Sequence, residues 1–229
     1  MPRVSCVVFA AKHIDPQWIR GKSVIDVGAC DFNGSIRPLI EQWGCASYLG
    51  VDMISGRGVD KVINADNLID EFGENSFDVV LSLEMMEHSR NWQASLHNMK
   101  RICKPDGLLI ITAPSKGYMY HGYPTDFWRY QPEDFTKILS DFDVIATEYD
   151  DAGPGAFVAA RKPTDFQEKD LEYYELFSVV TGTHIFKVKE EHFQCKYFKK
   201  TVLKMKIKGG LEQTYRKLGR ILTKLLGIK

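Results

Sequence analysis

Short β-rich apolar runs alternate with segments of helical spacing over the first two thirds of this chain. The clearest runs are FDVVLSL, beginning at Phe77, and LLIITAP, beginning at Leu108. Both are continuous apolar runs, as expected for strands buried on both faces of a parallel sheet. Helical spacing between them places four residues on one face: Trp92, Leu96, Met99 and Cys103. This alternation predicts a doubly wound α/β fold.

The remaining elements extend the same pattern. Strands are expected at 23–28, 47–52 and 61–66, and helices at 36–43, where Ser35 can cap the helix, and at 132–140. The KPDG stretch before Leu108 predicts a turn. Two consecutive β-rich runs, 142–150 and 155–163, predict a hairpin and therefore one antiparallel strand. Together these runs predict a Rossmann-like, mostly parallel seven-stranded sheet with an antiparallel last strand.

Composition limits the class of protein. No apolar run approaches the roughly 20 residues that a membrane-spanning helix needs. The start, MPRVSCVVFAAKH, lacks the pattern of a signal peptide and predicts a strand or a helix. The five cysteines form no C-x-x-C pair, so we expect free thiols in a cytoplasmic protein. The 229 residues suffice for one α/β domain over 1–162 and an extension over 163–229.

The loop after the first strand, VIDVGACDFNGS, indicates the ligand class. A dinucleotide fingerprint would place glycines where this loop has Gly28, Cys30 and Asn33. Only Gly28 matches, which argues against a pyrophosphate. Asp26 would attract a cation or an amine rather than a phosphate. The loop therefore favours a ligand with one nucleoside and a positively charged tail.

Polar residues also end the next strands, where ligands bind in open parallel sheets. Asp52 is placed to accept hydrogen bonds from ribose hydroxyls, and Asp66 with Asn67 is placed near an adenine amino group. The stretch LSLEMMEH, ending at His88, closes the fourth strand.

Taken in order, five motifs resemble the class I S-adenosylmethionine-dependent methyltransferases: VIDVGACDFNG, YLGVDM, INADNL, FDVVLSLEMMEH and LHNMKRICKPDGLLIITAP. The resemblance covers Ser23 to Lys162 and implies S-adenosylmethionine as the cofactor, which has no phosphate to cradle. It implies that the methionine end of the cofactor meets Asp26, Gly28, Ala29 and Cys30, with Leu83 and Glu84 beside it. It implies that the nucleoside end meets Asp52, Met53, Asp66 and Asn67. Cys30 departs from the family, in which many members have glycine.

The methyl acceptor is indicated less directly. A hydroxyl nucleophile needs a general base, and His88 and His121 both follow strand ends. Six aromatic residues lie between Tyr118 and Tyr130, interleaved with His121, Asp126 and Arg129. The segment resembles the DFWR stretch of bacterial methyltransferases found with polysaccharide and glycoconjugate biosynthesis. We therefore expect a sugar or glycoconjugate hydroxyl as the acceptor and His121, His88 and Asp126 as catalytic residues, although Asp126 and Arg129 can instead pair as a latch.

Two alternatives remain. In the first, EMMEH resembles the E-x-x-E-H string with which RNA 3′-end and quinone-biosynthesis methyltransferases bind a divalent ion; the set here would be Glu84, Glu87, His88 and His121. We expect no metal, because the same string occurs in members that bind none. In the second, the chain is a methyltransferase-like module without catalysis.

The last part of the chain differs in charge from the rest. Residues 187–229 hold 13 Lys and Arg against three Glu, a net charge of +10, which leaves −10 on residues 1–186. A basic amphipathic helix is predicted beyond Gly210, with Leu211, Tyr215, Leu218, Leu222 and Leu225 on one face. It would lie on an anionic membrane, or dock on the acidic body or on a second subunit of a homodimer. No ordered aromatic and basic module supports a nucleic-acid partner.

Overall fold

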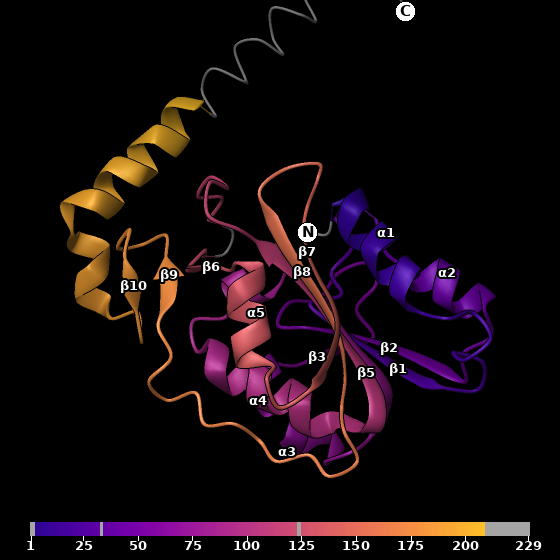
Figure 1. The fold of residues 1–229 in the computed structure, drawn as a ribbon. Coiled ribbons are helices and arrows are strands. Elements are labelled where there is room, and N and C mark those ends of the chain that lie inside the picture. The colour runs from indigo at the N-terminus through magenta and orange to yellow at the C-terminus, as the bar shows by residue number, and fades with distance from the viewer. Residues whose placement is uncertain (1–2, 33, 123–124, 209–229) are drawn as a thin grey trace, which may run out of the picture.

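The computed structural model describes residues 3–32, 34–122 and 125–208, and a seven-stranded sheet forms its centre. The strands lie in the order β3-β2-β1-β4-β5-β8-β7 (Figure 1). Their bounds are β1 Ser23–Val27, β2 Ser47–Asp52, β3 Lys61–Val62, β4 Phe77–Leu83, β5 Cys103–Pro114, β7 Asp143–Tyr149 and β8 Gly155–Arg161. All neighbours pair in parallel except β8, which is antiparallel to β5 and β7. The predicted sheet is confirmed.

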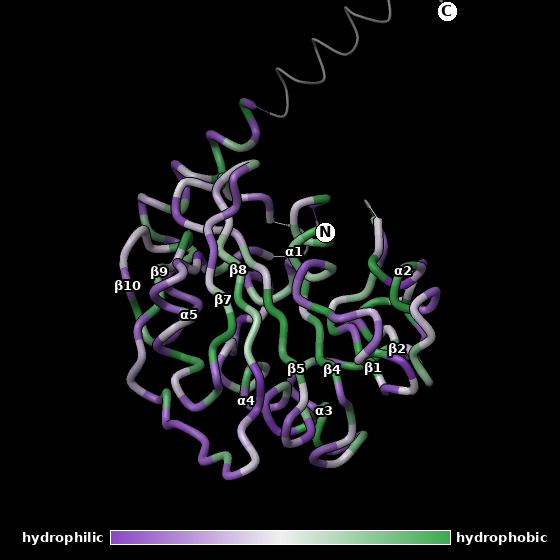
Figure 2. The backbone as a smooth tube through the Cα atoms, turned by 45° about the vertical axis from the view of Figure 1, so that its right-hand side comes forward, coloured by the Kyte–Doolittle hydropathy of each residue, from purple (hydrophilic) through white to green (hydrophobic). Residues whose placement is uncertain are grey.

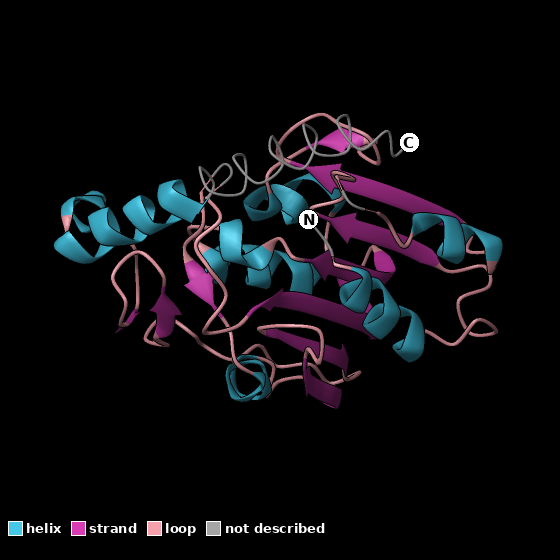
Figure 3. Ribbon diagram, turned by 90° about the horizontal axis from the view of Figure 1, so that it is seen from above, coloured by secondary structure: helices cyan, strands magenta, loops and turns pink. Residues whose placement is uncertain are grey.

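Helices cover both faces of this sheet (Figure 3). Their bounds are α1 Val4–His13, α2 Arg37–Gln42, α3 Leu68–Phe72, α4 Trp92–Ile102 and α5 Pro132–Ile138. Successive residues of β4 point to opposite faces, so Val79 packs with α1 and α2, whereas Val80 packs with α3, α4 and α5. The residues of the central strands are accordingly among the most hydrophobic of the chain (Figure 2). The α/β fold is thus doubly wound, as the alternating pattern predicts.

Two strands differ from the predicted bounds for local reasons. The third strand ends at Val62 rather than at Asp66, because the Asn64 side chain accepts a hydrogen bond from the Asp66 amide and starts the short 3₁₀ turn η1, Ala65–Asn67. The fifth strand begins at Cys103 rather than at Leu108. The predicted KPDG turn lies inside this strand, where the pairing of β5 with β4 shifts in register. Asp106 in this turn has a φ of 62°.

The C-terminal extension packs on the body. A second sheet joins β6 Trp128–Arg129 to β9 Leu176–Ser178 and β10 His184–Ile185. Leu176, Val180 and Val188 are buried in the same core as α4 and α5. The 3₁₀ turn η3, Glu190–Gln194, leads into a helix over 196–208.

The helix predicted beyond Gly210 lies outside the described residues. Within the described part of the chain, no helix has the length and apolar character that a membrane crossing requires. The five cysteines are free thiols, as predicted.

Candidate active site

A cavity of about 720 Å³ lies at the carboxyl ends of β1, β2 and β4. This is where ligands bind in open α/β sheets, and the volume suits a small organic ligand. Besides Glu84, seven of the predicted cofactor residues and catalytic histidines line it directly: Gly28, Cys30, Asp52, Met53, Asp66, His88 and His121.

Gly28 lets the floor of the cavity approach a ligand closely. Its φ is +92°, and a Cβ atom there would lie 2.5 Å from the Cβ of Met85. Any other residue at position 28 would bring backbone strain from the positive φ and a clash of its Cβ atom with Met85. The amides of Gly28 and Ala29 both donate to the Val51 carbonyl, which fixes the turn. The space left by the missing side chain fits a ligand lying flat against this loop.

The Asp52 carboxylate is held at the end of β2. Its Oδ2 accepts a hydrogen bond from the Cys30 amide at 3.1 Å, and its Oδ1 accepts one from the Ile54 amide at 3.2 Å. A carboxylate retains further lone pairs, so both oxygens can still accept from a diol. Met53 and Ile54 stand exposed beside it at 56% and 36% and offer an apolar wall. This arrangement suits a ribose and the base attached to it.

Asp66 lies across the cavity in η1. Its Oδ1 accepts a hydrogen bond from the Ser95 hydroxyl at 2.5 Å, and Ser95 also contacts Ser89 at 2.6 Å. Asn64, Ala65 and Asp66 all line the cavity. They form a polar edge of the cavity, where a base with an amino group can be recognised.

Glu84 marks the opposite end of the cavity. It is buried and adopts a φ of 61°, which is rare outside glycine. Burial and the neighbouring Glu87 raise its pKa, while Arg3 opposes that shift. The Arg3 guanidinium lies 3.0 Å from Glu84 and 2.8 Å from Asp150, and 5.1 Å from the centre of the Tyr118 ring.

A buried carboxylate and two imidazoles meet beside Glu84. Glu87 lies in the 3₁₀ turn η2, Met86–His88, and is fully buried. Its Oε1 is 3.5 Å from His88 Nε2 and 3.7 Å from His121 Nε2. Within the described residues, neither Glu87 oxygen has a hydrogen-bond partner. Burial alone would raise the pKa of Glu87, but His121 and His88 outweigh it and lower the pKa.

The two histidines are held differently. His88 Nδ1 contacts the Thr125 carbonyl oxygen, so this nitrogen carries the proton and Nε2 faces Glu87. His121 Nδ1 lies 2.9 Å from Asp126 Oδ2. Burial lowers the pKa of His121, but Asp126 and Glu87 outweigh it and raise the pKa to about 9. His121 is therefore an imidazolium at neutral pH in this arrangement.

Asp126 supports the site without lining the cavity. Burial acts against its ionisation, yet Arg129 and His121 hold its pKa well below the ordinary value. The Arg129 guanidinium binds it through two contacts of 2.5 and 2.7 Å, and both residues are buried. The latch between Asp126 and Arg129, expected as an alternative, is thus present. Asp126 contacts His121 and does not itself line the cavity.

Four predicted cofactor residues do not line the cavity. Asp26 is buried, and its Oδ2 accepts a hydrogen bond from the Tyr48 hydroxyl at 2.7 Å. Ala29 and Leu83 are buried and absent from the lining of the cavity, and Asn67 is the last residue of η1, one position after Asp66. Each stands next in sequence, or nearly so, to a residue that does line the cavity, so sequence position alone could not separate them.

The aromatic segment is mostly core. Trp128 and Tyr130 are fully buried and Phe127 is 5% exposed. The Tyr130 ring stacks on Phe135, and the Trp128 indole donates to the Ser89 carbonyl. Of the aromatic residues that the structure describes here, Tyr118 and Phe127 line the cavity. Trp128 and Tyr130 therefore pack inside the protein and do not line the cavity.

Sequence reasoning missed Arg3, Arg90 and Lys187, which also line the cavity. Arg3 precedes α1 and lies 81 residues from Glu84 along the chain. Lys187 comes from the C-terminal extension. No local pattern marks either residue, because each reaches the site only through the packing of a distant segment.

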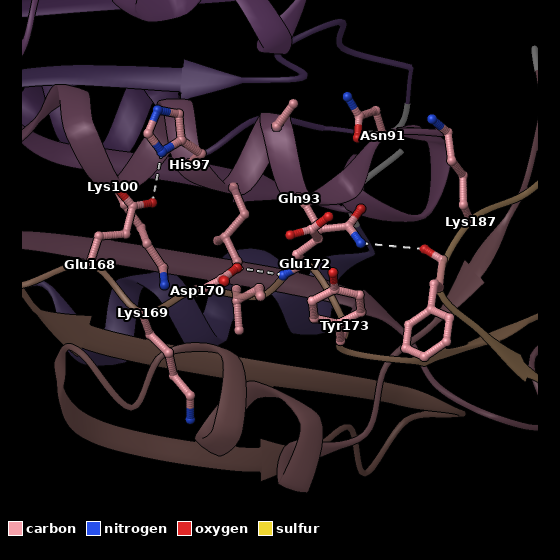
Figure 4. Close-up of a pocket in the computed structure, with 14 residues that line it drawn as sticks. Asn91, Gln93, His97, Lys100, Glu168, Lys169, Asp170, Glu172, Tyr173 and Lys187 are labelled. Atoms are coloured by element: carbon pink, nitrogen blue, oxygen red, sulfur yellow. Dashed lines mark hydrogen bonds and ion pairs between the residues drawn. The ribbon is translucent and has the colours of Figure 1, made fainter.

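A second hollow, of about 820 Å³, lies between α4 and the segments 168–173 and 186–187 (Figure 4). Its polar groups pair with one another: His97 Nδ1 lies 2.8 Å from Glu168 Oε1, and the Gln93 amide donates to the Phe186 carbonyl at 3.3 Å. None of the predicted cofactor or catalytic residues lines it. The predicted cofactor residues and catalytic histidines that line a cavity therefore gather at the first one.

Known proteins share the sequence pattern of this chain. A family model described as a methyltransferase domain matches residues 12–144, more than half of the chain. Two highly reducing polyketide synthases, from Pyrenophora dematioidea and Aspergillus nomiae, are 34% and 36% identical over 61 residues. That segment is 27% of this chain and only 2% of either synthase, so the chain spans a small fraction of these relatives.

Solved structures share the fold. The 1,6-didemethyltoxoflavin-N1-methyltransferase of Burkholderia thailandensis, solved with S-adenosylhomocysteine, has a TM-score of 0.52 at 16% identity and covers 70% of this chain and 77% of its own. An S-adenosylmethionine-dependent methyltransferase of Mesorhizobium loti has a TM-score of 0.50 at 15% identity, with coverage of 69% and 98%. The [4+2]-cyclase SpnF has a TM-score of 0.53 at 14% identity, with coverage of 69% and 80%.

The family match and the shape of the cavity are both consistent with S-adenosylmethionine as the ligand. A glycine floor, a carboxylate at the end of β2 and a polar edge in η1 fit a nucleoside with a short charged tail, and the sheet order matches the fold of these structures. The chain belongs to the methyltransferase domain family, and its fold is similar to that of S-adenosylmethionine-dependent methyltransferases of known structure.

Proposed function

We propose that the protein methylates a hydroxyl group of a sugar or glycoconjugate. One observation carries the proposal: His88 and His121 line the cavity that also holds Gly28 and Asp52, and their Nε2 atoms lie 3.5 and 3.7 Å from the buried Glu87 carboxylate. A hydroxyl must lose its proton as its oxygen attacks a methyl group, so a proton acceptor has to lie within reach of it. A nitrogen or sulfur acceptor would not need such a cluster to the same degree.

The cofactor has a defined place in this proposal. Asp52 would hold the ribose, Asp66 with Asn64 the adenine, and the backbone at Gly28 the methionine end, close to Glu84. When bound, S-adenosylmethionine supplies a methyl group on a positively charged sulfur. The protein contributes position and a desolvated surface.

His88 is the proton acceptor in our proposal. The Thr125 carbonyl fixes its proton on Nδ1, which leaves the Nε2 lone pair free for an acceptor hydroxyl. Glu87, 3.5 Å from Nε2, then stabilises the imidazolium that forms. His121 lies between the two carboxylates of Asp126 and Glu87 and serves as a fixed positive charge near the attacking oxygen.

A polyhydroxylated acceptor is favoured by the rim of the cavity. Arg90, Asn91 and Lys187 supply hydrogen-bond donors there, and Tyr118 offers an aromatic ring beside His121 at 5.4 Å between centroids. Flat sugar faces pack on such rings while their hydroxyls meet polar side chains. The resemblance of the DFWR segment, Asp126 to Arg129, to methyltransferases of glycoconjugate biosynthesis points the same way.

The test is methyl transfer from S-adenosylmethionine to a panel of nucleotide sugars, oligosaccharides, phenols and RNA, with products weighed by mass spectrometry. We expect a singly methylated sugar. His88→Gln should lower turnover by about 100-fold or more while the cofactor dissociation constant stays within about twofold. His97→Gln, in the second hollow, is the matched control and should behave as the unchanged protein.

Three results would contradict the proposal. Full turnover by His88→Gln would remove His88 as the proton acceptor. Methylation of phenols or RNA alone would exclude sugars. Cofactor binding without transfer to any acceptor would favour the methyltransferase-like module without methyl transfer.

A second candidate is a metal-assisted O-methyltransferase. One ligand atom from each of Glu87, His88 and His121 lies within 4.8 Å of the others, and such nitrogen and oxygen donors suit a divalent transition metal. The unpartnered Glu87 oxygens fit this assignment. Glu84, the fourth residue of the expected set, is instead paired with Arg3.

Metal content separates the two candidates. If the second holds, the purified protein carries about one divalent ion per chain, Glu87→Gln loses it, and a chelator abolishes turnover until Mn²⁺ or Zn²⁺ is restored. Turnover that a chelator leaves unchanged would exclude the metal-assisted reaction and retain the first proposal.

A further inference from the structure

The helix over 196–208, called here the lysine helix, extends from the body of the protein (Figure 1). It carries six lysines and no acidic residue: Lys196, Lys199, Lys200, Lys204, Lys206 and Lys208. The nearest acids along the chain are Glu191 and Glu212. This surface is therefore strongly positive, on a body that is negative overall.

One side of the lysine helix is attached to the protein. The Phe198 ring lies 5.2 Å from Phe193 and 5.5 Å from Tyr120, measured between ring centroids. Val202 and Met205, which share its side of the helix, are half-buried. The helix thus has a fixed orientation, and its opposite side faces solvent.

The solvent side combines aliphatic and cationic groups. Leu203 and Ile207, one helical turn apart, are 57% and 55% exposed. Lysines flank them on both sides, and the five at 196, 199, 200, 204 and 206 are exposed and make no ion pair with the part of the chain that the structure describes. Two aliphatic side chains framed by unneutralised lysines are typical of a helix that lies in a lipid interface.

We propose that the lysine helix binds an anionic lipid surface, with Leu203 and Ile207 entering the acyl boundary and the lysines meeting acidic headgroups. The lysine stems can lie along the apolar layer while their ammonium groups stay at the headgroup level. Positive charge near such a membrane is attracted by the negative surface potential, and this attraction falls as salt rises.

Other occupants suit this surface less well. A nucleic acid would meet the lysines but would leave Leu203 and Ile207 exposed among phosphates. A second copy of the chain, related by twofold symmetry, would bring like charges together. A lipid surface satisfies both kinds of side chain at once.

The position of the lysine helix gives this binding a consequence for the enzyme. Phe198 packs on Tyr120, which lies in the chain between the cavity-lining residues Tyr118 and His121. A lipid surface bound by the helix would therefore lie near the acceptor end of the cavity. The proposed contact between the lysine helix and the lipid surface does not depend on which hydroxyl compound is methylated.

The test is co-sedimentation of the full chain with vesicles of phosphatidylglycerol and phosphatidylcholine, and with vesicles of phosphatidylcholine alone. We expect binding to the anionic vesicles only, weakened by added salt. The variants Lys200→Glu with Lys204→Glu, and Leu203→Ser with Ile207→Ser, should each weaken binding by about tenfold or more. The control is the double variant Lys12→Glu with Lys137→Glu, at two exposed lysines on α1 and α5. It makes the same change in charge and should bind anionic vesicles as the unchanged protein does.

Both helix variants should bind the cofactor as the unchanged protein does, because neither alters the cavity. Cofactor binding therefore distinguishes a failure of the lipid proposal from a failure of the proposed function. Unchanged vesicle binding by the lysine helix variants would overturn the assignment. So would binding to RNA without binding to vesicles, or conversion of a dimer to a monomer by Leu203→Ser with Ile207→Ser.

Discussion

Two residues just after β4, Glu84 and Glu87, are held in energetically unfavourable states. Glu84 is held at a φ of 61° while buried, and such a backbone costs on the order of 1–3 kcal/mol. Glu87 is buried with no hydrogen-bond partner in the described residues. An apolar sequence would be more stable here, so these groups are best explained by the ligand and the chemistry that they serve.

Gly28 provides a test of the floor of the cavity. Gly28→Ala places a Cβ 2.5 Å from Met85, so the loop must shift and we expect cofactor affinity to fall by at least about tenfold. Gly21→Ala is the control, because Gly21 also has a positive φ of +69° but has open space around it. Calorimetric titration measures both. Equal affinity in the two variants would mean that the floor does not approach the cofactor.

Asp26 predicts a pH effect on stability. Burial raises its pKa from 3.8 to about 6 in the folded protein, against the hydrogen bond from Tyr48. Below pH 4 both states hold the proton; between about pH 4 and 6 only the folded state does, so stability is lost as pH rises. The loss amounts to about 3 kcal/mol at most.

The measurement is urea unfolding of the unchanged protein and of Asp26→Asn at pH 4, 5, 6 and 7. We expect the variant to gain relative stability up to pH 6 and to level off above it. A difference that does not depend on pH would show that Asp26 titrates normally in the folded state.

Among the elements, α1 contributes more to the stability of the fold than its length suggests. It begins one residue after Arg3, whose guanidinium joins Glu84 at the end of β4 to Asp150 beyond β7. Gly155 makes room for it, since a Cβ there would lie 2.4 Å from the guanidinium. The helix therefore fastens two strand ends at the cavity.

Removing Arg3 should weaken this attachment. Arg3→Ala leaves the Glu84 and Asp150 carboxylates buried without their cation, and we expect the free energy of unfolding to fall by about 1–3 kcal/mol. Lys12→Ala, on the same helix, removes only an exposed pair with Glu148 and should cost less than about 1 kcal/mol. Urea unfolding compares the two. Equal losses would mean that the Arg3 contacts are no stronger than a surface ion pair.

The elements also show how far sequence reasoning reaches. The bounds of β2 and β4 match the predicted ones, because apolar runs and their polar ends are local signals. The short β3 was not predictable from apolarity, because the Asn64 side chain redirects the backbone. Arg3 and Lys187 were not predictable at all, since distant packing brings them to the cavity. His88 and His121 were found because strand ends converge at one edge of the sheet.

For the whole molecule, the body and the described part of the extension share one core. Leu176 is fully buried with α4 and α5, and β9 pairs with β6 of the body. Folding of residues 163–188 should therefore be coupled to folding of the sheet.

Leu176→Ala tests this coupling. We expect a loss of about 2–5 kcal/mol in the free energy of unfolding, in one cooperative transition followed by both fluorescence and circular dichroism. Leu203 is 57% exposed, so Leu203→Ala should change the free energy of unfolding by no more than about 0.5 kcal/mol. Two separate transitions would show that the extension folds independently.

We expect the cavity at the ends of β1 and β2 to hold S-adenosylmethionine through Asp52. The most direct test is calorimetric titration of the cofactor into the unchanged protein, into Asp52→Ala and into Asp70→Ala, an exposed carboxylate on α3. We expect one cofactor per chain, with the binding free energy weakened by about 1.5–3 kcal/mol in Asp52→Ala alone, the value of hydrogen bonds to a charged group. No binding by the unchanged protein, or equal affinity in all three, would contradict this expectation.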